Sequence, residues 1–139
     1  MVRRLLVLIF SVLMLTMLSA CSKTSSSGQP VEVKVTAGDF YFKSSLTTFQ
    51  QGVQYHFVVT NTGNVAHELM IMKPMETTGN MEEMDKQALA HIEETDLQPG
   101  KAASIDYTFT QAYSSGTLEL ACHLQGHYEQ GMHLDIEVK

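Results

Sequence analysis

The sequence predicts an all-β sandwich or barrel with one inserted short helix. Short stretches in which apolar and polar residues alternate recur along the chain, which is the period of a half-buried strand. One stretch, around residues 80–92, has helical spacing instead. The composition, 44% hydrophobic and 17% charged, is that of a globular domain. With 139 residues the chain has room for a single such domain, which we expect at 31–139.

The first twenty residues have the features of a secretory signal peptide. Arg3 and Arg4 supply the positive start, and 5–17 is an apolar run too short to span a membrane comfortably. The residues that follow, Leu18-Ser19-Ala20-Cys21, resemble the bacterial lipobox, in which cleavage precedes a cysteine that is then lipidated. This resemblance implies a signal peptide at 1–20 and a protein anchored through Cys21 outside the cytoplasm, in the periplasm or on the outer face.

Ordinary signal-peptide cleavage is the alternative for Cys21. It would leave this residue as a free thiol or as a disulfide partner of Cys122, the chain's other cysteine. Residues 22–30, rich in serine with glycine and lysine, have no apolar periodicity. We expect 21–30 to be the lipidated cysteine followed by a flexible tether.

The charge balance bears on possible partners. Removal of Arg3 and Arg4 leaves seven basic and fifteen acidic residues, a formal charge of −8. This excess of negative charge argues against nucleic acid and against an anionic membrane surface as ligands. A basic protein partner remains possible, and so does a simple role in solubility.

Strand-like alternation accounts for most of the expected domain. Residues 31–35 alternate strictly, and 40–49 form a second, interrupted stretch. The apolar residues of 53–59 fall on one face, and 103–109 alternate again after a turn at 95–100. Between these strands, Asn80 and Glu83 resemble a helix start with a capping residue and its reciprocal acid. Helical spacing then continues through Met81, Met84, Ala88 and Ile92, which predicts about three turns.

The same alternation directs three chemically notable side chains toward the interior. His67 shares its face with Leu69 and Ile71, and Cys122 ends a run in which the even-numbered residues face inward. Met132 begins a similar run, whereas its neighbour His133 faces outward. His127 lies in a loop, where strand parity does not apply.

The residues that carry chemistry gather near the C-terminus. Residues 122–132 read Cys-His-Leu-Gln-Gly-His-Tyr-Glu-Gln-Gly-Met. Cys122, His127 and Met132 are evenly spaced there and form a soft ligand set that favours copper. One more imidazole, for which His67 is the obvious candidate, would complete the two-histidine, one-cysteine plane with a weak axial methionine of blue copper sites. The alternative is a buried thiol and thioether with two hydrogen-bonded histidines and no metal.

At these residues the chain resembles the cupredoxins, the type 1 blue copper proteins, and especially their small bacterial lipoprotein members. The loop of that group often reads Cys-His-x-x-Gly-His-x-x-x-Gly-Met, and every position matches 122–132. The resemblance covers 31–139, specifically in this loop and loosely elsewhere. It implies a Greek-key sandwich or barrel of seven or eight antiparallel strands. It also implies one type 1 copper ion held by His67, Cys122, His127 and Met132.

The function implied by the resemblance is one-electron transfer with transient redox protein partners, by a monomer held at a membrane through its lipid. One departure concerns Glu68, because many members of the family carry asparagine or serine after the first histidine. In the family, the residue after the first histidine donates a hydrogen bond that stabilises the thiolate. With Glu68 there, the resemblance does not predict the reduction potential of this site.

The same residues are compatible with other metals and other functions. Cysteine and two histidines also suit catalytic zinc, but a methionine opposite them is unusual there. No enzyme is expected, because protein donors fill all four positions. The main alternative is a copper carrier or store that delivers copper to an oxidase. It is favoured by a group of methionines that could bind cuprous ion or simply pack beneath the helix: Met70, Met72, Met75, Met81 and Met84. An interaction module with incidental metal is a third possibility.

Overall fold

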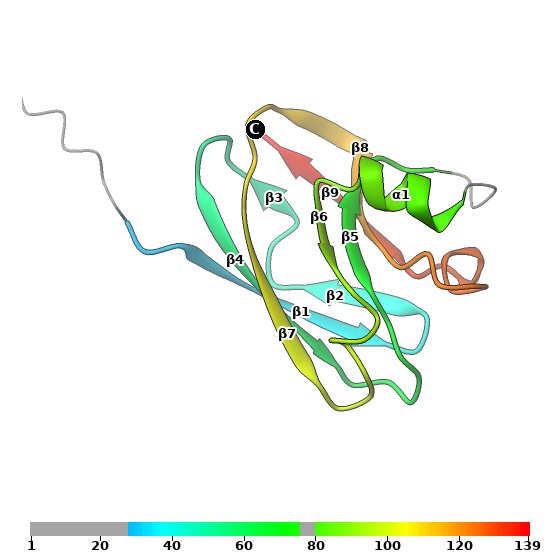
Figure 1. Ribbon diagram of the computed structural model, residues 1–139. Helices are drawn as coiled ribbons and strands as arrows, with labels where there is room; N and C mark the ends of the chain where they lie inside the picture. Colours follow the sequence, from blue (N-terminus) through cyan, green and yellow to red (C-terminus); the bar gives the residue numbers. More distant parts are fainter. Residues whose placement is uncertain (1–27, 76–79) are drawn as a thin grey trace, which may run out of the picture.

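Two β-sheets packed face to face form the domain (Figure 1). The computed structural model describes residues 28–75 and 80–139. The predicted signal peptide at 1–20, Cys21 and most of the tether lie outside the described residues. Within the described part of the chain, no helix has the length and apolar character needed to cross a membrane.

The first sheet has the strand order β2-β1-β4-β7. Its strands are β1 (Val31–Gly38), β2 (Tyr41–Ser44), β4 (Gln54–Asn61) and β7 (Ala102–Thr108). Strands β1 and β4 pair in parallel, and the other two pairs are antiparallel.

The second sheet has the order β3-β9-β8-β5-β6. Its strands are β3 (Thr48–Phe49), β9 (His133–Val138), β8 (Tyr113–Ala121), β5 (Leu69–Met72) and β6 (Ala90–Ile92). Strand β3 pairs with β9 in parallel. The all-β sandwich is therefore confirmed, but the expectation of purely antiparallel sheets was wrong. Between β1 and β4 the chain crosses to the other sheet through β3, so β4 returns beside β1 in the same direction.

Alternating residues of the two sheets meet in a central core, as the sequence predicted. Phe49, Phe57 and Phe109 are fully buried at its centre, with ring centroids of Phe49 at 5.6 Å from Phe57 and 5.2 Å from Phe109. These tilted contacts add to the burial of the large apolar rings. The core thus fixes the two sheets against each other beneath the loops that join them.

Helix α1 (Met81–Gln87) begins where expected but is shorter than predicted. Asn80 caps it, because its side chain accepts a hydrogen bond from the Glu82 N–H at 3.1 Å. The helix ends at Gln87, and Ala90 and Ile92 instead lie buried in β6 with His91 between them. The prediction of helix through Ile92 was wrong because edge pairing with β5 satisfies this backbone and buries the same apolar residues.

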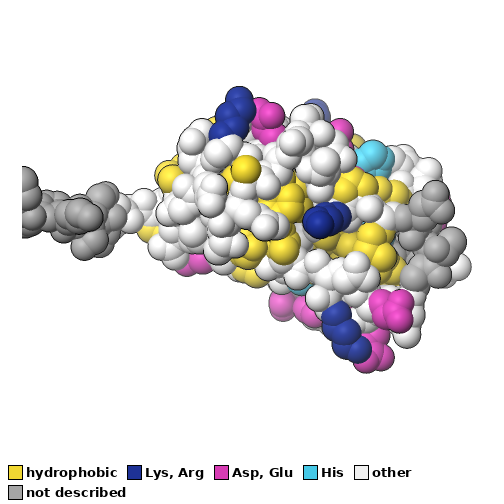
Figure 2. Space-filling model, turned by 90° about the horizontal axis from the view of Figure 1, so that it is seen from above, with side chains coloured by type: hydrophobic (Ala, Val, Ile, Leu, Met, Phe, Trp, Pro, Cys, Tyr) yellow, Lys and Arg dark blue, Asp and Glu magenta, His cyan; other side chains and the backbone are white. Residues whose placement is uncertain are grey.

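Strand β5 is buried on both faces, as parity predicted for its methionines. Leu69 and Ile71 join the central core, while Met70 and Met72 form a second cluster with Met84 of α1. An adjacent pocket of about 200 Å³ is lined by Met72, Lys73, Met75, Gln87 and Leu89. Seen from above, the molecular surface shows hydrophobic side chains gathered around a basic one (Figure 2). Helix α1 therefore covers the outer face of β5 with flexible thioethers.

Met84 should carry most of the stabilising contact between α1 and β5. Its exposed fraction is 3%, whereas that of Met81 on the same helix is 37%. We expect Met84→Ala to lower the free energy of unfolding by about 2–5 kcal/mol, because it leaves a cavity over Met70 and Met72. Met81→Ala should change it by less than about 0.5 kcal/mol. Urea denaturation of both variants measures this, and equal effects would show that the helix is not anchored by Met84.

Candidate metal centre

The loop that joins β8 to β9 closes on itself through the backbone of Met132. The Cys122 N–H donates to the Met132 carbonyl at 3.1 Å, and the Met132 N–H donates to the His127 carbonyl at 3.1 Å. A short 3-10 helix, η1 (Tyr128–Gln130), follows His127 and ends at Gly131, whose φ of +95° suits glycine. The loop thereby brings Cys122 and His127 together.

His67 reaches the same place from the loop between β4 and β5, which crosses from the first sheet to the second. Its N–H donates to the Leu97 carbonyl at 3.2 Å. Asn61 shapes the preceding turn, because its side-chain amide donates to the carbonyls of Val65 and Leu97, both at 2.8 Å. His67 is fully buried as predicted, although Val65, expected on the same face, is exposed because regular strand begins only at Leu69.

Three predicted donor atoms converge at this point. The Nδ1 atoms of His67 and His127 are 3.3 Å apart, and Cys122 Sγ lies 3.3 Å from His127 Nδ1. All three donor atoms lie within 4.8 Å of one another. Bonds of about 2.0 Å to nitrogen and about 2.3 Å to sulfur at trigonal angles would separate the donors of one ion by about 3.5 and about 3.7 Å. The observed spacing therefore fits a single metal ion.

The electrostatic state of these donors also suits a cation. Burial raises the pKa of the free Cys122 thiol to about 11. Burial, together with the charge of His127, lowers the pKa of His67 and so favours the neutral imidazole. His67 Nε2 has no hydrogen-bond partner among the described residues, because Asp39 Oδ1, at 3.7 Å, is too distant. A metal ion would replace the thiol proton and supply the positive charge that this site lacks.

Met132 lies beside this group and is fully buried, as parity predicted. The two hydrogen bonds of its backbone tie it to Cys122 and to His127. His133, the next residue, has a side chain 42% exposed and begins β9. The chain therefore places a thioether, rather than an imidazole, on the buried side of this loop end.

Solved structures with the same architecture were found. They include dithionite-reduced auracyanin from Roseiflexus castenholzii, with a TM-score of 0.59 and 17% identity over 81% of this chain and 99% of that one. Auracyanin A of Chloroflexus aurantiacus, described as a "blue" copper protein, gives a TM-score of 0.56 and 17% identity over 80% of this chain and all of that one. The chain therefore has a cupredoxin-like fold.

Two curated proteins that are similar to this chain in sequence are named copper-resistant cuproprotein CopI. The protein from Pseudomonas aeruginosa is 29% identical, over 72% of this chain and 71% of its own length. The protein from Rubrivivax gelatinosus is 28% identical, and the alignment covers 72% of this chain but only 61% of the relative. No family model matches the chain.

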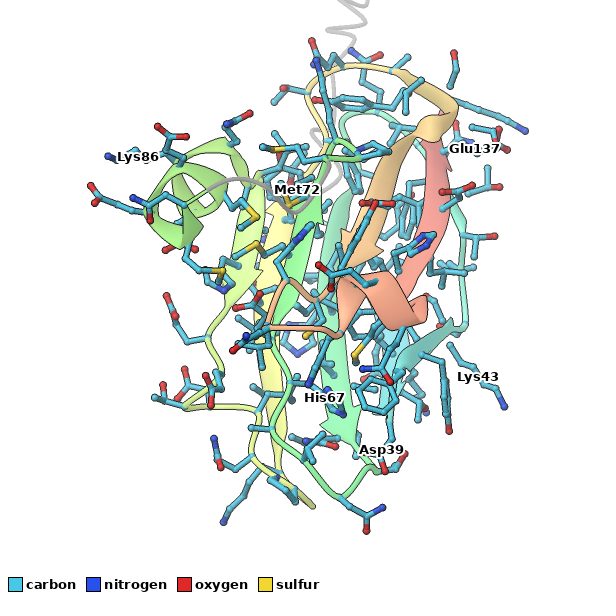
Figure 3. All side chains as sticks on the ribbon, turned by 90° about the vertical axis from the view of Figure 1, so that its right-hand side faces the viewer. Asp39, Lys43, His67, Met72, Lys86 and Glu137 are labelled. Carbon is cyan, nitrogen blue, oxygen red and sulfur yellow. The ribbon has the colours of Figure 1, made fainter. Side chains whose placement is uncertain are left out.

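The turn between β1 and β2 supports both histidines, a contribution that sequence reasoning missed. Asp39 accepts hydrogen bonds from the backbone and side chain of Asn64, at 2.8 and 2.7 Å, and these bonds lower its pKa. Figure 3 shows Asp39 and His67 at the same end of the molecule, away from Met72. A side chain at Gly63 would collide with the Asp39 carboxylate and lie 2.9 Å from His67 Nε2. Only glycine therefore leaves room for this approach.

Phe40, the next residue, supports the second histidine. It adopts a φ of +65°, which is costly for a residue with a side chain. Its ring meets that of His127 edge to face, with centroids 5.2 Å apart. The turn thus borders both imidazoles: the Phe40 ring packs on His127, and the Asp39 carboxylate lies 3.7 Å from His67 Nε2. Nothing in the local pattern of 39–40 signals this, because the contacts span long separations in the sequence.

Glu68 joins the two ligand segments. Its side chain is 2% exposed, and Oε1 accepts a hydrogen bond from the His123 N–H at 2.8 Å. Its backbone N–H donates toward the Cys122 sulfur and lowers the pKa of the thiol against the effect of burial. His91 Nε2 lies 3.4 Å from Glu68 Oε2, and the carboxylate raises the pKa of His91. The Glu68 carboxylate therefore connects the His67 segment to His123, and the nearby His91 imidazole partly balances its charge.

Metal-free protein should lose stability at alkaline pH because of Cys122. The folded pKa of about 11 exceeds the ordinary value of 9.0 for a cysteine thiol, so the native state keeps the proton to higher pH than the unfolded chain does. The protonated Cys122 thiol contributes on the order of 3 kcal/mol to the free energy of unfolding. This contribution is complete below pH 9 and is lost as the pH rises to 11. Denaturation of the metal-free protein and of Cys122→Ser at pH 8–11 tests this. The wild type should weaken more steeply, and parallel curves would contradict the raised pKa.

Proposed function

We propose that this protein is an extracytoplasmic copper protein that binds one type 1 copper ion through His67, Cys122, His127 and Met132 and transfers single electrons. The observation that carries the proposal is the convergence of the two Nδ1 atoms and the Cys122 sulfur within 4.8 Å. The names of the CopI relatives as cuproproteins support copper as the ion.

Copper is preferred to zinc because of the softness of the donors. A buried thioether at Met132 adds a ligand type that suits copper and is rarely found beside zinc. A dinuclear copper site would need a second cysteine beside Cys122, and the only other cysteine of the sequence is Cys21. A single ion is therefore the proposal.

In electron transfer, the protein holds the metal-binding side chains in a fixed geometry. Copper, when bound, supplies the one-electron change between its cupric and cuprous states. Cys122 and His127 are held by the closed loop, His67 by its bond to Leu97, and the imidazoles by the 39–40 turn. His67 and Cys122 are buried and His127 is half-buried, and a ligand set that is already in place needs little rearrangement when its charge changes. Because protein donors occupy every position, we propose no enzymatic reaction here.

A second candidate function is copper handling, in which the protein carries or stores copper for an oxidase. The cluster of Met70, Met72 and Met84, with Met75 packed against it, supplies thioethers of the kind that bind cuprous ion. The description of the relatives as copper-resistant also favours this candidate. Reversible oxidation and reduction without loss of copper would favour electron transfer, whereas rapid transfer of cuprous ion to a chelator would favour handling.

Attachment and partners complete the proposal. Lipidation of Cys21 would hold the domain, as a monomer, beside a membrane through the 21–30 tether. From there it would meet redox proteins transiently, and its formal charge of −8 after processing suits a partner with a basic surface. The same charge disfavours nucleic acid.

The cupric protein should show an intense visible absorption band that depends on Cys122. Cys122→Ser should abolish the band, because a hydroxyl is a hard donor of high pKa and cannot replace the thiolate. Cys21→Ser serves as the matched control and should keep the band. Optical titration with one equivalent of cupric ion measures both, and an intensely coloured Cys122→Ser protein would rule out this site.

The axial position should tune the potential rather than retain the metal. Met132→Leu should keep both copper and strong colour, because His67, Cys122 and His127 remain. It should raise the reduction potential, since loss of a donor disfavours the cupric state more, and each tenfold change in preference corresponds to about 59 mV. Voltammetry should find Met72→Leu unchanged. A shift of the reduction potential in Met72→Leu with none in Met132→Leu would show that Met132 is not the axial ligand.

Cys21→Ala should release the protein from membranes. Two or more acyl chains give stable attachment, at about 0.8 kcal/mol per buried methylene, and no other anchor is proposed. Fractionation of cells that express the variant and the wild type measures this. Retention of Cys21→Ala in membranes washed with high salt would contradict lipid anchoring.

A further inference from the structure

Three ligand-type side chains meet on the outer face of β8 and β9, and none of them belongs to the His67, Cys122 and His127 group. Glu119 of β8 lies directly opposite Asp135 of β9, and His133 is on the same face of β9 two residues earlier. One donor atom from each lies within 4.8 Å of the others. The neighbouring Leu118, Leu120 and Ile136 face the core instead. Figure 1 shows the two strands side by side.

Glu119 is in an unusual state for a carboxylate on this face. Its exposed fraction is 1%, and its Oε1 has no hydrogen-bond partner among the described residues. Its other oxygen, Oε2, lies 3.5 Å from His133 Nδ1. Burial raises its pKa, against the opposing effects of a hydrogen bond from Tyr128 and of His133. Asp135, directly across the strand pair, adds a second negative charge and so makes the arrangement less favourable.

Tyr128 holds this group in position. Its ring stacks on that of His133, with centroids 4.9 Å apart and an interplanar angle of 29°. Burial raises the pKa of its phenol, and so does the hydrogen bond that its hydroxyl donates to the Glu119 carboxylate. One residue of the η1 helix therefore fixes the orientation of two of the three side chains, as outer partners of metal ligands commonly do.

We propose that Glu119, His133 and Asp135 form a second metal site, which takes a divalent first-row transition cation such as Zn²⁺ or Cu²⁺. Two carboxylates and an imidazole are oxygen and nitrogen donors, which suit these ions rather than cuprous ion. A divalent ion would balance the negative charges of both carboxylates at once. His133 and Asp135 are exposed, so an ion can reach the site from solvent. The proposal goes beyond the copper function and does not depend on it.

Zinc titration of ¹⁵N-labelled protein, followed by amide NMR, tests the proposal. Zn²⁺ should produce saturable shifts around Glu119, His133 and Asp135. Asp135→Asn should raise the dissociation constant at these signals by at least about tenfold, because it removes one of three ligands at an exposed position. Asp106→Asn is the matched control, since Asp106 also pairs with a histidine, at 2.6 Å from His56, but on the other sheet. It should leave the titration unchanged.

Three results would overturn this site: no saturable shifts on β8 and β9, an unchanged dissociation constant in Asp135→Asn, or equal weakening in Asp106→Asn. The first two would leave Glu119 and His133 as an ion pair only, and the third would mark a general charge effect. Signals near His67, Cys122 and His127 report the first site separately in the same titration. Failure of one site is therefore distinguishable from failure of the other.

Discussion

The hydrogen bonds that close the 122–132 loop through Met132 are the constraint on which the rest of the structure depends. They join Met132 to Cys122 on one side and to His127 on the other, and so turn the chain directly from β8 into β9. The same closure places Tyr128 over the outer face of the strand pair, against Glu119 and His133. One short loop therefore organises a buried soft-ligand group on its inner side and an oxygen and nitrogen group on its outer side.

His67 and His127 lie against residues from other parts of the fold. Asp39 and Phe40, in the β1–β2 turn, approach His67 and His127 respectively, and Glu68 links the His67 segment to the residue after Cys122. Strand β5, which follows His67, is packed on one face by the central core and on the other by the methionines beneath α1. This double burial leaves the segment that carries His67 little freedom to move, which suits the electron transfer that we propose.

Alternation and spacing predicted much of this arrangement from sequence. Alternation predicted that His67, Cys122 and Met132 face inward. The assignment of His127 came from its spacing in the loop and from the family resemblance. Local patterns failed where the structure depends on contacts between distant segments. They did not predict the parallel pairing of β1 with β4. They also missed the strand at Ala90–Ile92, which pairs with β5 in spite of its helical spacing. The role of Asp39 was also hidden, because its partners His67 and Asn64 lie far along the chain. The predicted signal peptide and lipid anchor remain predictions.

We propose that two imidazoles and one thiolate bind one copper ion where His67, Cys122 and His127 converge. X-ray absorption at the copper edge, on protein loaded with one equivalent of copper, tests it most directly. We expect two nitrogen scatterers at about 2.0 Å and one sulfur at about 2.3 Å, with any contribution from Met132 at a longer distance. A shell of thioether sulfurs alone, or of nitrogen and oxygen without a short sulfur, would contradict the claim.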